Sequence, residues 1–374
     1  MKKTLFVNGR ELTRPVLHSM RRILLETVPR LADYFEIVLL SDLPLEKTLL
    51  ESLRIPPEQN QAWGKPALKS CSHLHYNRWM GQRVRSLQPD FFFEVHHKLL
   101  FHPGRTKALV MVHDYYVMEG VEPFPRVIKL KQRMSARKTL SRAHAIMAPS
   151  QFSKDSVNRF FSYPVEKIFV NPPGIDHSLD CVSVKPGSLP PGPFLFFVGR
   201  ISYWKGIDLL IRAMSEKSFP QNINVVLAGN VEARFRPALE KALFSHPRLC
   251  SLGRISNEER EYLFRKTEAF IYPTRFEGFG IPPLEAALRE CPVLVSDIPI
   301  MKEVTHGIAA YFPLEEGAPA LARAVRDLLA HPDPEKLREM RQTAESYTWD
   351  AFAEKMKEIL VEGSVVKGLG LDSF

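Results

Sequence analysis

Short, almost wholly apolar segments alternate with amphipathic helical patterns along most of this chain. In the first half the apolar segments lie at residues 4–7, 36–40, 91–95, 108–112, 145–148 and 168–170, with helical patterns at 19–31 and 126–143. In the second half they lie at 194–198, 224–228, 269–272 and 292–296, with helical patterns at 206–214, 257–266, 283–290 and 318–330. Strands that are apolar on both faces belong to parallel sheets covered by helices on each side. The pattern therefore predicts an α/β protein built on parallel sheets.

A proline-rich stretch divides the two runs of alternating elements. Residues 181–193, CVSVKPGSLPPGP, contain four prolines and two glycines without a periodic apolar pattern, which is typical of a linker. We predict one Rossmann-like domain over residues 1–180 and another over 194–345, facing each other across a cleft. The segment 346–374 includes an amphipathic helix at 346–360, and the pattern leaves open whether this helix packs on the first domain or on the second.

Composition and the distribution of apolar residues exclude several classes of protein. With 45% hydrophobic and 25% charged residues, the chain has the composition of a globular protein. No apolar run approaches the ~18 residues of a membrane-spanning helix, and the start MKKTLFV has too few apolar residues for a signal peptide. The four cysteines lie far apart, which argues against a disulfide framework or a zinc site. We therefore expect a protein of the reducing cytoplasm.

The string FEGFGIPPLEAA, residues 276–287, is the strongest sequence signal of a ligand site. Its two prolines suit the first turn of a helix. Gly278 and Gly280 leave backbone amides open beside the positive end of that helix, which indicates an anion site. Glu277 in the loop and Glu285, expected in the first helical turn, would accept hydrogen bonds from hydroxyl groups. Taken alone, Glu285 could simply complement the helix dipole and the glycines could simply form a turn. Taken together, these residues indicate a sugar nucleotide as ligand.

A second string, FLFFVGRISYWKG (194–206), carries two cations just beyond a predicted strand. The strand ends at Gly199, and Arg200 and Lys205 flank the short loop before the next helix. This arrangement suits a diphosphate, because arginine offers a planar fork and lysine a point charge. Solvated surface cations are the alternative, and the nearby glutamate string favours the diphosphate. The sequence leaves open whether Trp204 stacks on a ligand or packs locally.

These two strings resemble the retaining glycosyltransferases of family 4, which have the two-Rossmann GT-B fold. The N-terminal VNGRELTRP (7–15) is similar to a subgroup that includes bacterial mannosyl- and rhamnosyltransferases of surface-polysaccharide synthesis. The resemblance spans nearly the whole chain and also rests on VMVHDYY (110–116), APSQFSKDSV (148–157), EKIFVNPPGID (166–176), residues 224–229, LGRISNEE (252–259), SDIPIMKEV (296–304) and the closing helix at 347–360.

The resemblance implies a role for each matching residue of the donor site. Arg200 and Lys205 would bind the donor diphosphate and stabilise the leaving group. Glu277 would hold hydroxyls of the transferred sugar, and Glu285 would bind the ribose. The remaining donor-binding residues are Gly199, Arg254, Ile255, Gly278, Phe279 and Gly280, with the base contacted largely by backbone atoms near Arg254 and Ile255.

On the acceptor side, the resemblance implies that His113 lies near the donor sugar, with Asp114 beside it. The family implies retention of configuration without a metal or other cofactor, and the sequence contains no DxD metal motif. Positioning and neutralisation of the leaving diphosphate would then dominate catalysis. The expected catalytic set is Glu277, His113, Arg200 and Lys205.

The chain departs from the family pattern at several positions. Ser19 stands where the family commonly has glycine, and its side chain narrows the space near the donor phosphates and the acceptor. Glu94 lies in a segment that resembles the acceptor-facing one, followed by His96–His97 in place of the commoner proline–asparagine. A metal there would need a third ligand, which the sequence does not supply. Glu290 replaces the glycine that often ends the helix after Glu285, a modest loss of capping.

The formal net charge of +9 is unevenly distributed, with +10 in residues 1–180 and −1 in residues 181–374. Arg126, Lys129, Arg133 and Arg137 recur at spacings of three or four residues, so they form one stripe on a helix. A solvated helix face and a surface for docking on anionic lipid both fit this stripe. Nucleic acid is not an expected partner, because no helix-turn-helix, zinc-finger or RNA-binding signature occurs.

The predicted function is a retaining, metal-independent hexosyltransferase of surface-polysaccharide synthesis. It would move a hexose, with mannose as the first candidate, from GDP-mannose or from a UDP- or dTDP-sugar to a glycan or a lipid-linked acceptor. A phosphorylase or nucleotide-sugar epimerase on the same fold, and a non-catalytic nucleotide-sugar-binding subunit, are the alternatives. The basic first half adds the expectation of peripheral association with the inner face of the cell membrane.

Overall fold

The computed structural model describes residues 2–14, 19–64, 73–178 and 182–362. The chain divides into two compact units. Unit 1 contains Met1–Glu119, Phe124–Gly174 and Thr348–Phe374, and unit 2 contains Gly120–Pro123 and Ile175–Tyr347. Each unit is built on one parallel sheet, which confirms the predicted α/β class.

Unit 1 contains a seven-stranded parallel sheet with the order β3-β2-β1-β4-β5-β6-β7. Its strands are β1 (Lys3–Asn8), β2 (Phe35–Ser41), β3 (Asn60–Ala62), β4 (Phe91–Glu94), β5 (Lys107–Met111), β6 (Ala145–Ala148) and β7 (Ile168–Val170). Its helices are α1 (Ser19–Leu31), α2 (Lys47–Ser52), α3 (His73–Leu87), α4 (Tyr116–Glu119), α5 (Arg126–Leu140), α6 (Gln151–Phe161) and α14 (Trp349–Glu362), with 3₁₀ turns at Arg10–Thr13, Pro57–Gln59 and Val165–Lys167.

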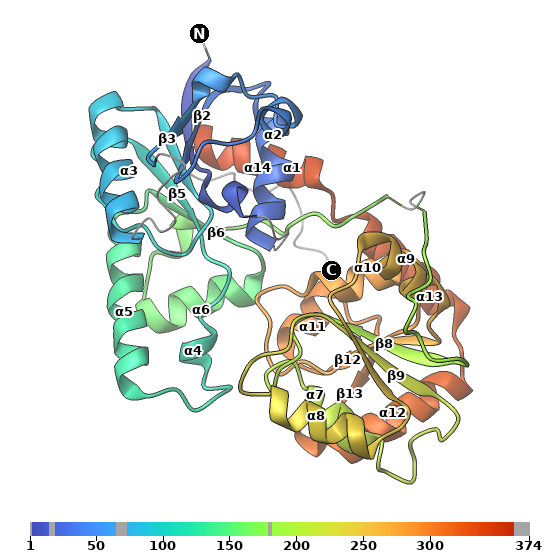
Figure 1. Ribbon diagram of the computed structural model, residues 1–374. Helices are drawn as coiled ribbons and strands as arrows, with labels where there is room; N and C mark the ends of the chain where they lie inside the picture. The colour runs from blue at the N-terminus through green and yellow to red at the C-terminus, as the bar shows by residue number, and fades with distance from the viewer. Residues whose placement is uncertain (1, 15–18, 65–72, 179–181, 363–374) are drawn as a thin grey trace. The chain divides into compact units, whose positions relative to one another are not determined.

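Helices cover both faces of this sheet (Figure 1). Leu5 and Val7 of β1 pack in a core with α1 and α14, whereas Phe6 between them packs in a second core with α3. The alternation follows from the two-residue period of a strand. The near-continuous apolar strands therefore bury side chains on both sides, as their sequences predict.

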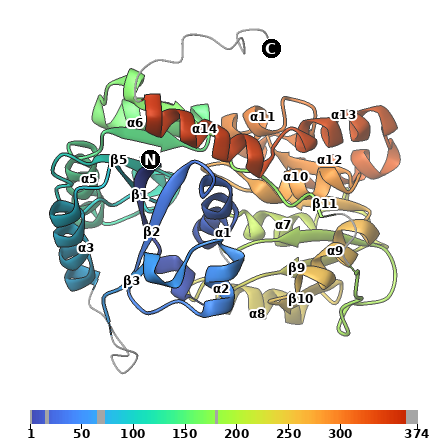
Figure 2. The same ribbon diagram turned by 90° about the horizontal axis from the view of Figure 1, so that it is seen from above.

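The closing helix α14 packs on unit 1, which is the first of the two alternatives left open by its sequence. It lies beside α1 (Figure 2), and Trp349, Phe352 and Met356 join the core of that unit. Arg30 of α1 donates to Asp350 at 2.6 Å. Unit 1 is therefore completed by residues from the far end of the chain.

Unit 2 contains a six-stranded parallel sheet with the order β10-β9-β8-β11-β12-β13. Its strands are β8 (Phe194–Val198), β9 (Asn224–Ala228), β10 (Leu249–Gly253), β11 (Ala269–Tyr272), β12 (Val293–Ser296) and β13 (Ala310–Phe312). Its helices are α7 (Ile207–Ala213), α8 (Arg236–Ser245), α9 (Asn257–Lys266), α10 (Ile281–Leu288), α11 (Pro299–Val304), α12 (Ala318–Ala330) and α13 (Pro334–Glu345), with a 3₁₀ turn at Leu314–Glu316.

Helix α10 spans Ile281–Leu288, whereas the sequence predicts a helix over residues 283–290. Gly280, with φ of 103°, turns the chain so that the helix begins at Ile281, with both prolines in its first turn. Glu285 consequently lies in the second helical turn, and the expectation of the first turn was wrong. The helix ends at Leu288, two residues earlier than expected.

The end of α10 leads to a prediction about stability. Glu290 donates its amide to Ala287 O at 2.9 Å and Cys291 to Ala286 O at 3.2 Å, a Schellman pattern that places Glu290 at φ of 55°. A non-glycine residue in the left-handed conformation lowers the free energy of unfolding by about 1–2 kcal/mol. The exposed ion pair of Glu290 with Arg341 raises it by less than about 1 kcal/mol. We expect Glu290→Gly to raise the free energy of unfolding by about 0.5–1 kcal/mol in urea titrations.

The matched control is Glu290→Ala, which removes the same ion pair but keeps a Cβ atom. It should not stabilise the protein, because the left-handed conformation stays strained. Equal unfolding free energies for the glycine and alanine variants would contradict the explanation.

Candidate active site

The sheet of unit 2 has one point at which the order of its strands reverses. Strands β10, β9 and β8 run in descending chain order and β11, β12 and β13 in ascending order, so the reversal lies between β8 and β11. Ligands of open parallel sheets bind outside the carboxyl ends of the strands at such a point. Residues 199–206 follow β8 and residues 273–280 follow β11, so both motif strings lie there.

Lys205 and Glu277 form a buried ion pair at this point, with each side chain 9% exposed. Lys205 Nζ also donates to the Tyr272 hydroxyl at 2.8 Å. Thr274 Oγ1 donates to Glu277 Oε1 at 3.0 Å, and the Trp204 ring lies 4.5 Å from Lys205 Nζ. The fold therefore brings a predicted diphosphate-binding cation and a predicted sugar-binding carboxylate into direct contact, away from most of the water.

Tyr272 and Thr274 are parts of this site that the sequence does not single out. Their only sequence signal is position, because Tyr272 ends β11 and Thr274 follows it, at the edge where the motif strings meet. Burial, and after it the charge and hydrogen bond of Glu277, raise the pKa of Tyr272 well above its ordinary value. The hydroxyl therefore keeps its proton and acts as a neutral partner of Lys205.

A glycine makes the contact between the two loops possible. Gly206 follows Lys205 and has φ of 72°. A Cβ atom at this position would lie 1.8 Å from the carbonyl oxygen of Pro273, which is backbone and cannot move away alone. Gly206 thus lets the loop after β8 lie directly against the loop after β11, and this approach sets Lys205 beside Glu277.

Glu285 is buried at 3% exposure on α10. Arg260 of α9 lies 3.5 Å from Glu285 Oε2 through Nη1 and 3.3 Å from Asp176 Oδ2 through Nη2. The Arg260 side chain is only 19% exposed, so the three groups share a partly desolvated position. Arg260 and Asp176 are further residues that the sequence does not identify, since the residues are 84 positions apart.

The other predicted donor residues also follow strands of this sheet at its carboxyl edge. Arg200 is exposed, and within the described ranges it has no hydrogen-bonding or ionic partner. Arg254 and Ile255 follow β10, two strands from β8, with Arg254 exposed and Ile255 half-buried. Phe279, between Gly278 and Gly280, packs edge-on against Tyr347 at 5.4 Å between ring centroids. Gly199 follows β8 with φ of 150°.

The predicted acceptor-side residues belong to unit 1. Ser19 is the exposed first residue of α1. His113 Nε2 lies 2.8 Å from Val95 O, so Nε2 carries a proton and donates to that carbonyl. Asp114 accepts a hydrogen bond from the Tyr116 amide at the start of α4. Glu94 is 1% exposed at the end of β4.

His96 lies between two carboxylates in unit 1. Its Nε2 is 2.8 Å from Glu11 Oε1, and its Nδ1 is 3.1 Å from Glu94 Oε1. Burial by itself would lower the pKa of His96, but the hydrogen bonds and charges of Glu11 and Glu94 outweigh burial and raise the pKa to about 9. Both ring nitrogens therefore carry protons at neutral pH.

We expect the His96 ring to titrate near pH 9 in an NMR titration of the folded protein. Because the folded pKa is raised above the ordinary value of 6.5, the protonated ring contributes stability that is fully present below pH 6.5. This contribution is lost as the pH rises through 9. Glu11→Gln should lower the pKa of His96, and an unchanged pKa in that variant would contradict the assignment.

The described residues contain no group of three or more His, Cys, Asp or Glu side chains arranged to hold a metal ion. Burial lowers the pKa of His97 to about 3, so this ring stays neutral.

Two family models match most of the chain. Residues 36–179 match Glycosyltransferase Family 4, and residues 184–347 match Glycosyl transferases group 1. The serotype-specific mannosyltransferase WbdA of Escherichia coli is 35% identical over 162 residues, which are 39% of this chain and 19% of the relative. The O-antigen chain mannosyltransferase RfbU of Salmonella typhimurium is 26% identical over 238 residues, 63% of this chain and 65% of the relative. The chain thus spans less than two thirds of each of these relatives.

The fold is also that of solved protein structures. Anabaena HepE in complex with UDP superposes with a TM-score of 0.71 at 18% identity, over 96% of this chain and 100% of that chain. At this identity the likeness concerns the fold, which agrees with two Rossmann-like domains. On these matches, the chain belongs to the GT-B glycosyltransferases, with the family 4 signature in its first half and the group 1 signature in its second.

Proposed function

We propose that this protein is a retaining hexosyltransferase that uses a nucleoside-diphosphate sugar and acts in surface-polysaccharide synthesis. Mannose from GDP-mannose is the first candidate, supported by the mannosyltransferase names of its relatives, and a UDP- or dTDP-sugar is the alternative donor. The acceptor is a glycan or a lipid-linked glycan. The observation that carries the proposal is the buried Lys205–Glu277 pair at the strand-order reversal of unit 2.

In the proposed reaction, the bond between the sugar and the diphosphate breaks with its electron pair leaving on the diphosphate. Lys205 and Arg200 neutralise that charge, so no metal has a part in the proposal. Glu277 accepts hydrogen bonds from sugar hydroxyls, and Glu285 from the ribose. The acceptor hydroxyl bonds to the sugar and passes its proton to the leaving phosphate, with His113 beside the sugar. Charges fixed in a site of low water content stabilise such a transition state most strongly.

A bound donor would have to replace the hydrogen bond between Lys205 and Glu277, because it needs both side chains. Lys205 donates to Glu277 in this structure, whereas the proposed reaction requires it at the diphosphate. Donor binding would therefore exchange the lysine–carboxylate contact for a lysine–phosphate contact and a carboxylate–hydroxyl contact. Both halves of the donor are needed for the exchange, which favours the intact sugar nucleotide.

The test begins with thermal unfolding in the presence of GDP, UDP, ADP and dTDP. The correct diphosphate at 100 times its dissociation constant adds about 2.7 kcal/mol of stability. The matching sugar nucleotide is then supplied with and without a glycan acceptor, and the anomeric configuration of the product is read by NMR. Product that forms without an acceptor, or only from inorganic phosphate, would instead indicate an epimerase or a phosphorylase. Binding without transfer or hydrolysis would indicate a non-catalytic subunit.

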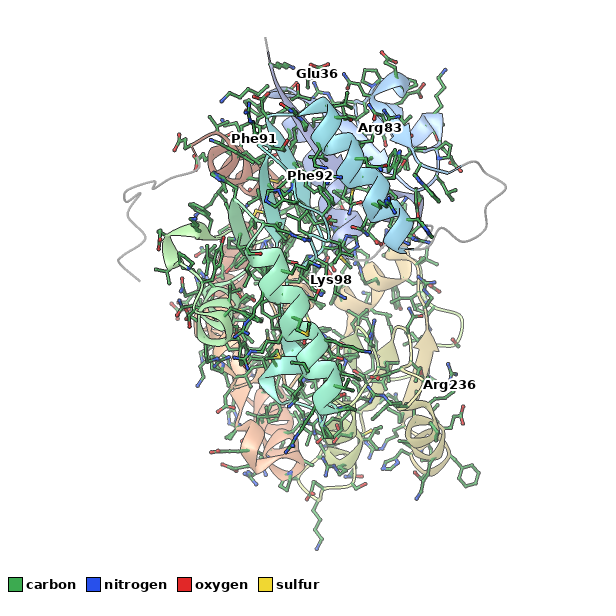
Figure 3. The ribbon with its side chains drawn as sticks, turned by 90° about the vertical axis from the view of Figure 1, so that its left-hand side faces the viewer. Glu36, Arg83, Phe91, Phe92, Lys98 and Arg236 are labelled. Atoms are coloured by element: carbon green, nitrogen blue, oxygen red, sulfur yellow. The ribbon has the colours of Figure 1, made fainter. Side chains whose placement is uncertain are left out.

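We further propose that α5 docks the protein on an anionic membrane surface. The stripe of Arg126, Lys129, Arg133 and Arg137 lies on this helix, which faces the viewer in Figure 3. Large apolar side chains are exposed on the same helix, with Val127 at 55%, Leu130 at 58% and Met134 at 64%. At 100° per residue, Leu130 and Met134 lie between the stripe and a second basic edge formed by Lys131 and Lys138. An apolar strip bordered by cations is typical of interfacial helices.

Within the described part of the chain, no helix has both the length and the apolar character needed to cross a membrane. The proposed association is therefore with the surface.

Vesicles with 30 mol% anionic lipid, a composition chosen for the assay, should bind the protein in sedimentation assays. Arg133→Gln/Arg137→Gln should weaken binding by about tenfold or more, at ~1 kcal/mol per cation. Leu130→Ser should weaken binding at high salt as well, because the apolar contribution is not screened. Equal binding to zwitterionic vesicles would contradict the docking surface.

A further inference from the structure

The sheet of unit 1 also has a point where its strand order reverses, between β1 and β4. A pocket of about 130 Å³ lies at the carboxyl ends of these two strands. Asn8 ends β1 and Glu94 ends β4, and both side chains line the pocket. The other lining residues are Arg10, Tyr76, Asn77, His96, His97 and Lys98. The pocket is thus lined by polar and charged residues, placed where parallel sheets bind ligands, and contained within one unit.

The carboxylates in and beside this pocket are already engaged. Glu94 accepts from Asn8 Nδ2 at 2.8 and 3.0 Å and from the His96 ring at 3.1 Å. Asp42 accepts from Arg10 Nε at 3.1 Å, from Thr13 Oγ1 at 2.7 Å and from Arg14 at 3.2 Å. These acceptors are therefore unavailable to a ligand that donates hydrogen bonds.

Two cations that line the pocket keep donors without acceptors. The Arg10 side chain is only 14% exposed, and its hydrogen bond to Asp42 uses Nε alone. Its two Nη groups have no hydrogen-bond acceptor in the described ranges. Lys98 has no hydrogen-bonded or ionic partner there either, and it lies near the start of α3 and the end of α5 in Figure 3. The two Nη groups of Arg10 reach solvent and can donate to an oxygen acceptor in the pocket.

The pairing of charges around the pocket leaves one cation available. His97 is neutral, while His96 is protonated at neutral pH. The charged groups that line the pocket are the cations Arg10, His96 and Lys98 and the carboxylate Glu94, and Asp42 and Glu11 pair with Arg10 and His96 from beside it. Arg10 pairs with Asp42 and His96 with Glu11 and Glu94, so Lys98 is the lining cation without a carboxylate partner in the described ranges, and a bound anion would neutralise its charge.

We propose that this pocket binds an anionic oxygen group of the acceptor, a phosphate or a carboxylate, through Arg10 and Lys98. The pocket volume of about 130 Å³ admits such a group. The acceptor assignment rests on the proposed transferase function, whereas the anion site itself rests on unit 1 alone. The site selects acceptors that carry a negative charge near the hydroxyl to be glycosylated.

Inorganic phosphate is the first probe, added to the full chain saturated with the nucleoside diphosphate that stabilises it most, so that the donor site is occupied. Ring resonances of His96, assigned with His96→Gln, report on the pocket. Arg10→Gln and Lys98→Gln should each weaken phosphate binding about tenfold or more, because each removes a charge-assisted hydrogen bond. Arg14→Gln is the matched control, since Arg14 shares Asp42 with Arg10 but does not line the pocket. Binding in that variant should stay within about twofold of the unchanged protein.

No His96 shift with phosphate, or equal weakening by Arg10→Gln and Arg14→Gln, would overturn the site. Lys98 is exposed, so Lys98→Gln keeps the test valid if Arg10→Gln does not fold. Transfer to a hexose 1-phosphate, a hexuronic acid and the neutral hexose then identifies the source of the charge. A preference for either charged acceptor, lost in Lys98→Gln, supports the proposal, and equal use of all three overturns the acceptor role. If Arg10→Gln and Lys98→Gln bind the nucleotide as the unchanged protein does, equal use of the three acceptors counts against the anion site and not against the transferase function.

Discussion

Glu277→Gln is expected to reduce turnover by about 10²–10³-fold while the protein remains folded. Loss of one preorganised polar group at a reacting centre typically has an effect of this size. The amide keeps the shape of the side chain and can still accept from Thr274. It removes the charge that holds Lys205 and accepts sugar hydroxyls. Rates are measured at saturating donor and acceptor, and folding is checked by urea unfolding.

Glutamine is preferred to alanine because of the buried pair. Removing one partner of a buried ion pair leaves the other charge unpaired, at a cost of about 3–5 kcal/mol. Both variants bear this cost, but glutamine keeps an amide oxygen that can accept from Lys205 and Thr274, whereas alanine also removes these hydrogen bonds and leaves a cavity. Glu277→Gln should bind the free nucleoside diphosphate as tightly as the unchanged protein or more tightly, because Lys205 is no longer paired with a carboxylate.

Glu261→Gln is the matched control. Glu261 is 2% exposed and pairs with Arg265 and with Arg289, so the change also weakens a buried ion pair. It lies on α9 and contacts neither Lys205 nor Glu277. Stability should fall in this variant without the loss of turnover. Similar rates in Glu277→Gln and Glu261→Gln would remove Glu277 from the proposed site.

Gly206→Ala is expected to lower the free energy of unfolding by about 2–5 kcal/mol and to abolish most activity. The left-handed conformation costs about 1–2 kcal/mol with a Cβ atom, and forcing an atom into occupied space costs about 1–3 kcal/mol more. The added atom would meet the Pro273 carbonyl oxygen at 1.8 Å. The two loops must then separate, which moves Lys205 away from Glu277. Urea unfolding and initial rates measure the two effects.

Gly307→Ala isolates the contribution of backbone conformation. Gly307 has φ of 75°, close to the 72° of Gly206, but a Cβ atom there meets nothing within 4 Å. This control should lose only about 1–2 kcal/mol. An equal loss in both variants would show that close approach of the loops has no part in the effect.

The positions of several strands in both sheets were predictable from sequence. The segments 194–198, 224–228, 269–272, 145–148 and 168–170 have the bounds of β8, β9, β11, β6 and β7. These strands are nearly continuous apolar runs bounded by turn residues, so local composition specifies them. Edge strands were predicted less well: β7 was found, but β3, β10 and β13 were not. The partly polar β3 (Asn60–Ala62) is held by pairing with β2.

The sequence alone was sufficient for the family resemblance, the parallel α/β class and the strings that end at the carboxyl edge of the second sheet. Those features depend on residues close together in the chain. Only the tertiary structure decided that Lys205 pairs with Glu277, 72 positions away, that Arg260 lies between Glu285 and Asp176, and that His96 meets Glu11, 85 positions away. Hydrogen bonds and pKa shifts depend on distances of a few ångströms, and strand order and close backbone approach at Gly206 set those distances.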